Sequence, residues 1–389
     1  MKCDICNLKY SLVFDFGKQF LANHYIKHIK YNAKVAYCNK CIILKCVHKI
    51  PNNKVFQTNY PYFSSLSSEF KIYLKKISKE LKNKLRKGKI LEIGSNDGSF
   101  LENFKSKNYQ TIGIEPAYSS HKIAVKKKIN SINKYFNDKS FKYLYKKYNS
   151  FDLIFSINTF AHIDEINKNF KLVRLLLNNR NKKSLFVFEN IDILSLIKKN
   201  DFSQLYDEHV YTLSANSIDN ICNKFKLVLY DVKKTKNQNG CLRYYIGHKN
   251  LKQKNSVKKI IQEEKKFINI SLMKNFYKNI LGIKKRSKIF FNDRNKKILA
   301  LGASAKATFI VNFLSLDNKC IKFIFDNSSY KINRYLPGTK IKIKNELLIK
   351  NIKNCYLFVF IPNHINEIIK KYGNLFKKRK IIIKSINDF

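Results

Sequence analysis

Short apolar runs alternate with amphipathic stretches through the middle of this chain. The runs lie at 90–93, 111–114, 153–156 and 185–188, and stretches with helical spacing separate them. Strands that are buried on both faces and alternate with helices form parallel sheets. The segment 71–245 is therefore predicted to fold as a parallel α/β domain.

A second series of apolar runs occupies the last part of the chain, 246–389. A Lys-rich helical segment over about 251–290 is expected to join it to the preceding domain. Strands with helices between them predict another doubly wound α/β unit here. The strands expected in this unit lie at 297–301, 321–325, 355–361 and 380–384.

Four cysteines near the N-terminus form two Cys-x-x-Cys pairs, Cys3 with Cys6 and Cys38 with Cys41. Each pair is a two-ligand turn, and two such turns supply the tetrahedral thiolate set that zinc prefers. Four thiolates leave no open coordination position, so one structural zinc per chain is expected. Free cysteines in a small core are the alternative. Residues 1–70 are predicted to be a zinc-binding domain.

Composition narrows the classes of protein that fit this chain. Its 389 residues are 44% hydrophobic, which suits two or three globular domains and not a disordered chain. No run of eighteen apolar residues and no secretory signal is found, so no membrane span is expected and the cytoplasm is the expected compartment. In that setting the nine cysteines favour metal binding over disulfides.

The formal charge of +50 raises the question of a nucleic-acid partner. The charge is nearly all Lys, whereas phosphate and base-edge recognition favours the planar fork of Arg. The Lys residues are spread over the whole chain without a stripe, so no specific nucleic-acid partner is expected. A functional polyanion site is the alternative, and the field would also attract an acidic, nucleotide-linked substrate.

A strand, a glycine-bearing turn and a helix start follow one another over 90–100. Glycines there let the backbone approach a ligand, and the helix N-terminus offers free N–H donors. Glu115 lies 21 residues after Gly94, where an acid accepts hydrogen bonds from the ribose of an adenosine cofactor. No third glycine follows at the spacing of the dinucleotide-binding motif, which favours S-adenosylmethionine over NAD as the cofactor. An ordinary turn between a strand and a helix is the alternative. The expected cofactor contacts are Glu92, Gly94, Ser95, Asn96, Gly98, Glu115 and Asn158.

Two further segments carry side chains suited to proton transfer. The segment 158–162 follows the third expected strand of the central domain, at the carboxyl edge where open α/β sheets bind ligands. Tyr206-Asp207-Glu208-His209 places an imidazole beside carboxylates that can fix its tautomer and raise its basicity. A packing histidine at His162 and a polar loop at 206–209 are the alternatives.

A set of motifs keeps one order along nearly the whole chain. It comprises both Cys pairs and the segments 60–65, 91–98, 113–117, 158–162, 206–209, 242–243, 302–306 and 335–339. This set resembles the sugar C-methyltransferases that act on deoxyhexoses linked to thymidine diphosphate. The chain departs from that family at 238–241, where it has Gln-Asn-Gly-Cys and the family usually has His-Gly-Gly-Ser. Which sugar and which carbon are methylated is therefore left open.

The resemblance implies a zinc-binding N-terminal domain, a class I (Rossmann-like) methyltransferase domain and a C-terminal Rossmann-like domain that helps hold the nucleotide-sugar. It matches the four cysteines of the pairs to zinc ligands and His209 to the proposed base. The residues matched or assigned to the active site are Tyr206, Glu208, His162, Tyr60 and Tyr62, with Arg243, Gly302, Ser304 and Lys306 expected to contact substrate.

The expected reaction is methyl transfer from S-adenosylmethionine to a carbon alpha to the ketone of a nucleotide-linked sugar. His209 would remove the proton, Glu208 would orient or polarise His209, and a tyrosine hydroxyl would stabilise the enolate oxygen. The alternatives are a zinc-ribbon RNA methyltransferase, O- or N-methylation of a sugar, and a non-catalytic zinc-binding protein. A monomer or homodimer is expected.

Overall fold

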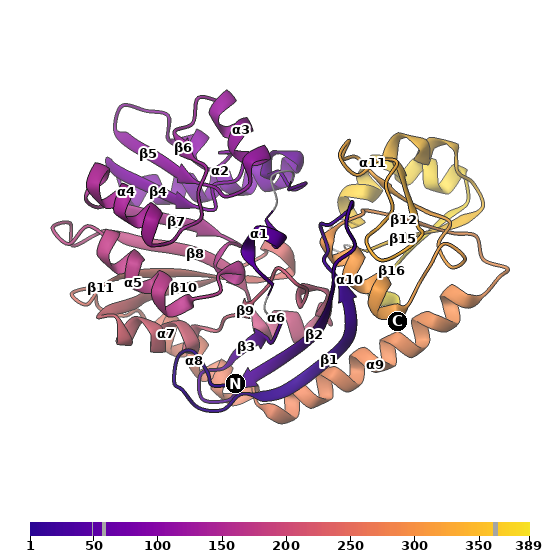
Figure 1. Ribbon diagram of the computed structural model, residues 1–389, viewed down its shortest axis with the longest axis horizontal. Helices are drawn as coiled ribbons and strands as arrows, with labels where there is room; N and C mark the ends of the chain where they lie inside the picture. Colours follow the sequence, from indigo (N-terminus) through magenta and orange to yellow (C-terminus); the bar gives the residue numbers. More distant parts are fainter. Residues whose placement is uncertain (49, 57–59, 361–364) are drawn as a thin grey trace.

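The computed structural model describes residues 1–48, 50–56, 60–360 and 365–389. Three sheets make up the molecule, one of four strands, one of seven and one of five. Figure 1 shows the seven-stranded and five-stranded sheets in two separate lobes, with the N-terminal strands and a long helix passing between them. The α/β fold expected from the apolar runs is confirmed in both lobes.

The N-terminal sheet is antiparallel, with the order β1-β2-β3-β9. Its last strand comes from much later in the chain, because Tyr211 and Thr212 pair with Lys45 and Leu44. The segment 206–209, which immediately precedes β9, is thereby held against this sheet. The strands are β1 (Ser11–Phe20), β2 (Lys30–Cys38), β3 (Ile43–Cys46) and β9 (Tyr211–Thr212), and a short helix α1 (Asn52–Val55) follows β3.

The central sheet has the order β10-β11-β8-β7-β4-β5-β6. Strands β4 to β8 are parallel, and β11 is antiparallel to both of its neighbours. All four strands expected from the apolar runs are present. The strands are β4 (Gly88–Ile93), β5 (Tyr109–Ile114), β6 (Ser131–Ile132), β7 (Leu153–Ile157), β8 (Leu185–Ile191), β10 (Leu227–Thr235) and β11 (Cys241–His248).

The helices of the central lobe have local sequence signals at their ends. In α2, Oγ of the N-cap Ser67 accepts from the N–H of Phe70 at 3.2 Å, and Leu74, Ile77 and Leu81 form the buried face. The α-helices are α2 (Ser68–Lys84), α3 (Tyr118–Lys126), α4 (Asp138–Tyr148), α5 (Ile166–Leu176), α6 (Ile193–Lys198) and α7 (Ala215–Lys224). The 3₁₀ turns are η1 (Ser64–Leu66), η2 (Leu101–Phe104), η3 (Phe160–His162), η4 (Phe202–Gln204) and η5 (Asn237–Asn239).

The C-terminal sheet is parallel throughout, with the order β14-β13-β12-β15-β16. The four expected strands are present, although the end of the run expected at 355–361 lies outside the described residues, and β14 was not expected. The strands are β12 (Ile298–Leu301), β13 (Phe323–Asp326), β14 (Lys342–Asn345), β15 (Cys355–Val359) and β16 (Ile381–Ser385). The helices and 3₁₀ turns are α10 (Ala305–Leu314), η6 (Glu346–Asn351), α11 (Ile365–Lys378) and η8 (Ile386–Asp388).

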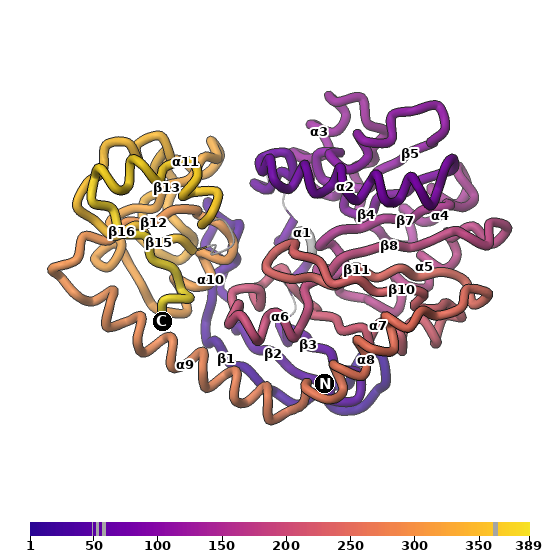
Figure 2. Tube along the Cα trace, turned by 180° about the vertical axis from the view of Figure 1, so that it is seen from behind, coloured from indigo at the N-terminus to yellow at the C-terminus, as the bar shows by residue number. Residues whose placement is uncertain are grey.

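The helical segment expected at 251–290 is two helices, α8 (Asn255–Phe267) and α9 (Ile270–Asn292). They divide at Asn269, whose side chain caps α9 by accepting from the N–H of Leu272 at 2.9 Å. Figures 1 and 2 show α9 running from the base of the central lobe to the C-terminal lobe. None of the helices in the described residues is long and apolar enough to cross a membrane.

Two of the hydrophobic cores cross from one sheet to another. One core contains the cysteine pairs together with residues of the central sheet. Another joins the N-terminal sheet to the C-terminal lobe, where the ring of Phe16 lies 5.0 Å from that of Phe309 and 5.4 Å from that of Phe313. The N-terminal sheet therefore packs against both lobes and sets their relative position.

Candidate active site

The four paired cysteines converge on one point. Their sulfur atoms all lie within 4.8 Å of one another, and those of Cys6 and Cys38 are 3.6 Å apart. Zinc–sulfur bonds of about 2.3 Å in a tetrahedron place sulfur atoms about 3.8 Å apart, so this donor set fits zinc. All four are free of disulfides, and three of them are buried.

The two cysteine pairs lie on separate turns that have the same backbone hydrogen-bond pattern. The carbonyl of Cys3 accepts from the N–H of Asn7 at 2.9 Å, and that of Cys38 accepts from Ile42 at 2.8 Å. Asn7 and Ile42 both have positive φ, 63° and 53°. That conformation costs a residue such as Ile about 1–2 kcal/mol, so the fold around the cluster must hold it. The cluster lies in the core shared with the central sheet and does not reach the histidines described below.

The turn after β4 is built for close backbone approach. Gly94 has φ +72°, and a Cβ added there would lie 2.2 Å from Oγ1 of Thr159. Gly98 has φ +76°, and a Cβ there would lie 2.9 Å from the side chain of Ile129. Side chains are excluded at both positions by conformation and by space.

Glu115, at the end of β5, is buried and faces this turn. Its Oε2 accepts from the N–H of Asn96 at 2.8 Å, and its Oε1 accepts from the N–H of Ala117 at 2.8 Å. Burial raises the pKa of Glu115 to about 7, although both backbone bonds oppose the rise. Each carboxylate oxygen can accept a further hydrogen bond, so the group retains capacity for a ligand.

Three buried polar atoms around the turn have no hydrogen-bond partner. They are Oε2 of Glu92, Oγ of Ser95 and Oδ1 of Asn158. Unpartnered buried polar atoms are uncommon in proteins, and a ligand bound at the turn would be able to supply partners for these three. Together with the glycines and Glu115, these atoms suit a nucleoside cofactor that carries an amino acid group.

The segment Tyr60–Ser65 ties this turn to a second cluster. Oδ1 of Asn96 accepts from the N–H of Ser64 at 2.8 Å, and Nδ2 of Asn96 donates to the carbonyl of Tyr62 at 3.2 Å. At the other end of the segment, the hydroxyl of Tyr60 donates to Oε2 of Glu208 at 2.7 Å. Tyr62 is 47% exposed, so its ring can meet a ligand.

Glu208 is buried at the centre of the second cluster. In addition to Tyr60, the hydroxyl of Tyr206 lies 3.5 Å from its Oε2, and Nδ2 of Asn23 donates to its Oε1 at 2.5 Å. Burial raises the pKa of Glu208 to about 7, and the three hydrogen bonds limit the rise. The carboxyl group is therefore able to change protonation near neutral pH.

His209 and His162 face each other with ring centroids 5.0 Å apart. Nδ1 of His209 lies 2.6 Å from the carbonyl oxygen of Gln204, and Nδ1 of His162 lies 2.6 Å from that of Glu208. A carbonyl can only accept, so both rings carry their proton on Nδ1 and present a lone pair at Nε2. Burial lowers the pKa of His162 to about 4 and that of His209 well below its ordinary value. Both imidazoles are neutral at pH 7.

The expected orienting role of Glu208 is corrected by these contacts. His209 is oriented by a backbone carbonyl, that of Gln204, and the Glu208 side chain bonds to Tyr60, Asn23 and Tyr206 instead. The two side chains follow each other in sequence but point to different partners.

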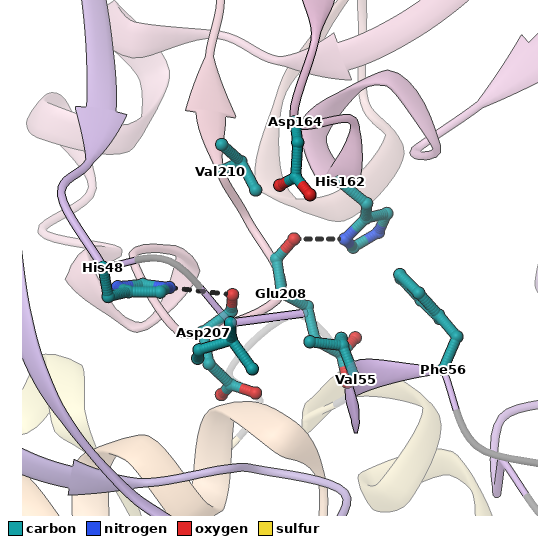
Figure 3. A pocket seen from close by; sticks show the side chains of 9 residues that line it. His48, Val55, Phe56, His162, Asp164, Asp207, Glu208 and Val210 are labelled. Carbon is teal, nitrogen blue, oxygen red and sulfur yellow. Dashed lines mark hydrogen bonds between the residues drawn. The ribbon is translucent and has the colours of Figure 1, made fainter. Parts of the chain in front are cut away.

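Behind this cluster lies a cavity of about 10 Å³, room for about one water molecule. Figure 3 shows His162 bonded to the Glu208 carbonyl on one side and His48 beside the Asp207 carbonyl on the other. Asp207 turns its carboxylate to the N–H of Ala22, 3.2 Å from Oδ1.

The C-terminal lobe reaches this cluster through the start of α10. Gly302 has φ +88°, and Oγ of Ser304 caps α10 by accepting from the N–H of Ala307 at 3.1 Å. Nζ of Lys306 lies 3.5 Å from Oδ2 of Asp201, and its charge contributes to the lowered pKa of His209. Three of the expected substrate contacts, Gly302, Ser304 and Lys306, therefore lie together at the end of β12 and the start of α10.

Arg243, which is expected to contact substrate, lies inside the protein. It is 6% exposed, and its guanidinium donates to Glu189 at 2.5 Å, to Glu80 at 3.0 Å and to Tyr73 at 3.1 Å. Four of its five N–H groups donate to protein atoms, so Arg243 holds the end of β8, and its expected contact with substrate stays a prediction. Its sequence context, Leu-Arg after a glycine loop, does not reveal this burial.

The unusual loop before Arg243 lies near Lys306. Gln238, Asn239 and Gly240 all have positive φ, and Nδ2 of Asn239 donates to Oδ2 of Asp201 at 3.3 Å. Asp201 thus joins this loop to the C-terminal lobe. Asp201, Gln204 and Asn23 belong to the site but carry no local motif, so only their distant partners identify them.

Comparisons with known proteins agree with this architecture. A model described as a methyltransferase domain matches residues 66–232, and one described as a C-methyltransferase C-terminal domain matches residues 236–386. C-methyltransferase NovU from Streptomyces niveus is 22% identical over 348 residues, which are 86% of this chain and 81% of that protein.

Two solved methyltransferases match part of the chain. Magnesium protoporphyrin IX methyltransferase from Synechocystis PCC 6803 is 10% identical, covers 46% of this chain and 83% of its own, and has a TM-score of 0.37. The plantazolicin methyltransferase BpumL is 14% identical, covers 51% of this chain and 92% of its own, and has a TM-score of 0.38. The family matches and the site together place the chain among the S-adenosylmethionine-dependent C-methyltransferases.

Proposed function

We propose that this enzyme methylates a carbon alpha to the ketone of a nucleotide-linked keto-sugar, a small-molecule substrate. The observation that carries the proposal is the pair of neutral, buried histidines beside Tyr206 and Glu208. A saturated carbon becomes nucleophilic only when it loses a proton, so such a reaction needs a base and a donor for the resulting oxyanion. The order of motifs shared with sugar C-methyltransferases supports the substrate class.

The turn at Gly94–Gly98 and Glu115 would hold the cofactor. S-adenosylmethionine supplies an electrophilic methyl group on a sulfonium. Glu115 would accept from its ribose hydroxyls, and the unpartnered atoms of Glu92, Ser95 and Asn158 are the candidates for the rest of the molecule. The cysteine cluster would hold one zinc without chemical part in the reaction.

His209 is the proposed base. Gln204 holds its proton on Nδ1, so Nε2 is free to take the proton from the substrate carbon. Because burial keeps the ring neutral, the basic form is the one present at neutral pH. The electron pair left on the substrate carbon would form the new carbon–carbon bond to the methyl group. The methyl–sulfur bond would break with its electron pair passing to sulfur, which leaves S-adenosylhomocysteine.

The enolate oxygen needs a hydrogen-bond donor, and Tyr206 is better placed than Tyr60. Tyr60 holds Glu208 at 2.7 Å, whereas Tyr206 lies 3.5 Å from the same oxygen and gives up little by turning to a ligand. His162, 5.0 Å from His209 between ring centroids, would help to shape the pocket.

The nucleotide is proposed to lie at the start of α10. Lys306 carries a positive charge there, and the first N–H groups of the helix after Gly302 and Ser304 favour phosphate. We propose the division 1–70, 71–245 and 246–389 for the three domains, in a monomer or homodimer.

Glu208 is the second candidate for the base. Its pKa of about 7 matches a general base better than the strongly lowered pKa of His209 does. Exchange of substrate hydrogen with deuterated water separates the two candidates, because it reports proton removal without methyl transfer.

The experiment mixes the enzyme, S-adenosylhomocysteine and a nucleotide-linked keto-sugar in deuterated water and follows the substrate by mass spectrometry. Wild type is expected to exchange the hydrogen alpha to the ketone, and His209→Asn is expected to lose about 100- to 10,000-fold in exchange and turnover. Tyr145→Phe is the control, since Tyr145 is 49% exposed in α4 and takes no part in the contacts of the site. Undiminished exchange in His209→Asn with loss in Glu208→Gln would move the role of base to Glu208.

A further inference from the structure

The segment Leu21–Tyr25, between β1 and β2, contacts both lobes of the enzyme. The N–H of Ala22 donates to the carboxylate of Asp207, and the carbonyl of Ala22 accepts from Oγ1 of Thr308 at 3.3 Å. The hydroxyl of Tyr25 donates to the carbonyl of Ala303 at 2.7 Å. A short piece of the N-terminal domain is thereby fixed between the loop 206–209 and the start of α10.

Asn23 stands at the centre of this segment and points to Glu208. Its Nδ2 donates to Oε1 at 2.5 Å, whereas both tyrosine hydroxyls approach Oε2. Asn23 is buried, at 9% exposure, so water does not replace this bond. Among the described residues Asn23 is the one side chain that donates to Oε1, and it comes from 185 positions away in the chain.

We propose that Asn23 is a positioning residue for methyl transfer, which holds the Glu208 carboxyl group in place and keeps it available for a change of protonation. The proposal rests on the proposed function, because it gives Glu208 a part in the proton chemistry. Asn23 belongs to the N-terminal domain, so under this proposal that domain contributes to the reaction as well as carrying the cysteine cluster.

An amide is suited to this position for a chemical reason. Its N–H donates to an ionised carboxylate, and after a half turn its oxygen accepts from a protonated carboxyl group. Asn23 can thus stay bonded to Glu208 in both states. Leucine has nearly the same shape but bonds to neither state, and an ionised aspartate repels the carboxylate.

Several titratable groups lie around Glu208 in addition to the amide of Asn23. The test must leave these groups unchanged. Tyr60 and Tyr206 bond to its carboxylate, and Asp207 precedes it. Burial raises the pKa of Tyr25 well above its ordinary value, and the charges of Asp326 and Glu208 add to that rise. His162 bonds to its carbonyl. None of these is altered in an Asn23 variant.

The first test is the dependence of kcat on pH. Burial raises the pKa of Glu208 to about 7, so the acid limb of the wild-type profile is expected near that pH. Asn23→Leu removes a donor to the ionised form, which should move the limb up by about one pH unit and lower kcat about fivefold at pH 7. Asn23→Asp should move it further, since two adjacent carboxyl groups share one proton. The KM for S-adenosylmethionine should stay unchanged.

The matched control is Asn169→Leu, another buried asparagine, in α5. If it shifts the limb as far as Asn23→Leu does, or if neither Asn23 variant shifts it, the proposal is overturned. The near-isosteric Asn23→Asp keeps the test decisive should the leucine variant fold poorly.

A second readout needs no substrate. In protein labelled with ¹³C at the glutamate carboxyl carbons, Glu208→Gln identifies the resonance of Glu208, and its midpoint is followed by NMR. The midpoint should rise from wild type to Asn23→Leu to Asn23→Asp. An unchanged midpoint refutes the role of Asn23 and leaves the proposed function intact. If wild-type enzyme does not exchange the hydrogen alpha to the ketone, although the Glu208 midpoint shifts in the Asn23 variants, the proposed function is refuted instead.

Discussion

Replacement of Glu115 by alanine tests whether the turn after β4 is the cofactor site. The carboxylate of Glu115 accepts the N–H groups of Asn96 and Ala117, each at 2.8 Å, and has capacity left for ribose hydroxyls. The two backbone bonds are lost in the free enzyme and in the complex alike. A bond to the ribose would be lost only in the complex, so it alone determines the change in affinity.

A hydrogen bond that involves a charged group contributes about 1.5–3 kcal/mol. Glu115→Ala should therefore weaken S-adenosylmethionine binding by about 10- to 150-fold in Kd. The free energy of unfolding should change by less than the two backbone bonds suggest, because the variant also removes the cost of burying a carboxylate. That cost is visible in the pKa of Glu115, which burial raises to about 7.

Isothermal titration of S-adenosylmethionine into wild type and variant measures this change. Glu102→Ala is the control, since Glu102 lies nearby in η2 but is 44% exposed on its side chain. The pH dependence gives a second check. The ionised form binds ribose better and its fraction grows as pH rises through 7, so wild-type affinity should increase from about pH 6 to about pH 8. Glu115→Gln should abolish this increase. Unchanged affinity in Glu115→Ala would show that the turn is only an element of the fold.

Three further predictions concern the metal, the glycine turn and the charge. Metal analysis should find about one zinc per chain in wild type and clearly less in Cys38→Ser, and a chelator should lower the Tm of the N-terminal sheet. Full zinc content in Cys38→Ser would contradict zinc binding by the four cysteines. Gly94→Ala should lose measurable S-adenosylmethionine binding and about 1–3 kcal/mol of stability in urea titration, because a methyl group would meet Thr159 at 2.2 Å; wild-type values for both would refute this. Binding to RNA should be weak, independent of sequence and abolished by salt. Nanomolar affinity for one RNA in physiological salt would show that the basic surface is a specific nucleic-acid site.

The sequence by itself determined the features that depend on short-range spacing. The Cys-x-x-Cys pairs, the strand that ends at Gly94 and the acid at Glu115 each express a local backbone requirement. The apolar runs likewise predicted eight strands of the central and C-terminal sheets, because a strand buried on both faces must be apolar throughout. β14, with polar residues and one buried isoleucine, carries too little of that pattern to be predicted.

The roles of side chains were decided only by the tertiary structure. Adjacent residues in the 206–209 motif turn to different partners, so Glu208 bonds to Asn23 and His209 to the Gln204 carbonyl. Arg243 follows a loop that suggested a ligand contact, yet the pairing of β11 with β8 places it opposite Glu189, inside the protein. A hydrogen bond depends on position and direction within a few tenths of an ångström, and 185 residues of intervening chain leave no trace of such a contact in the sequence.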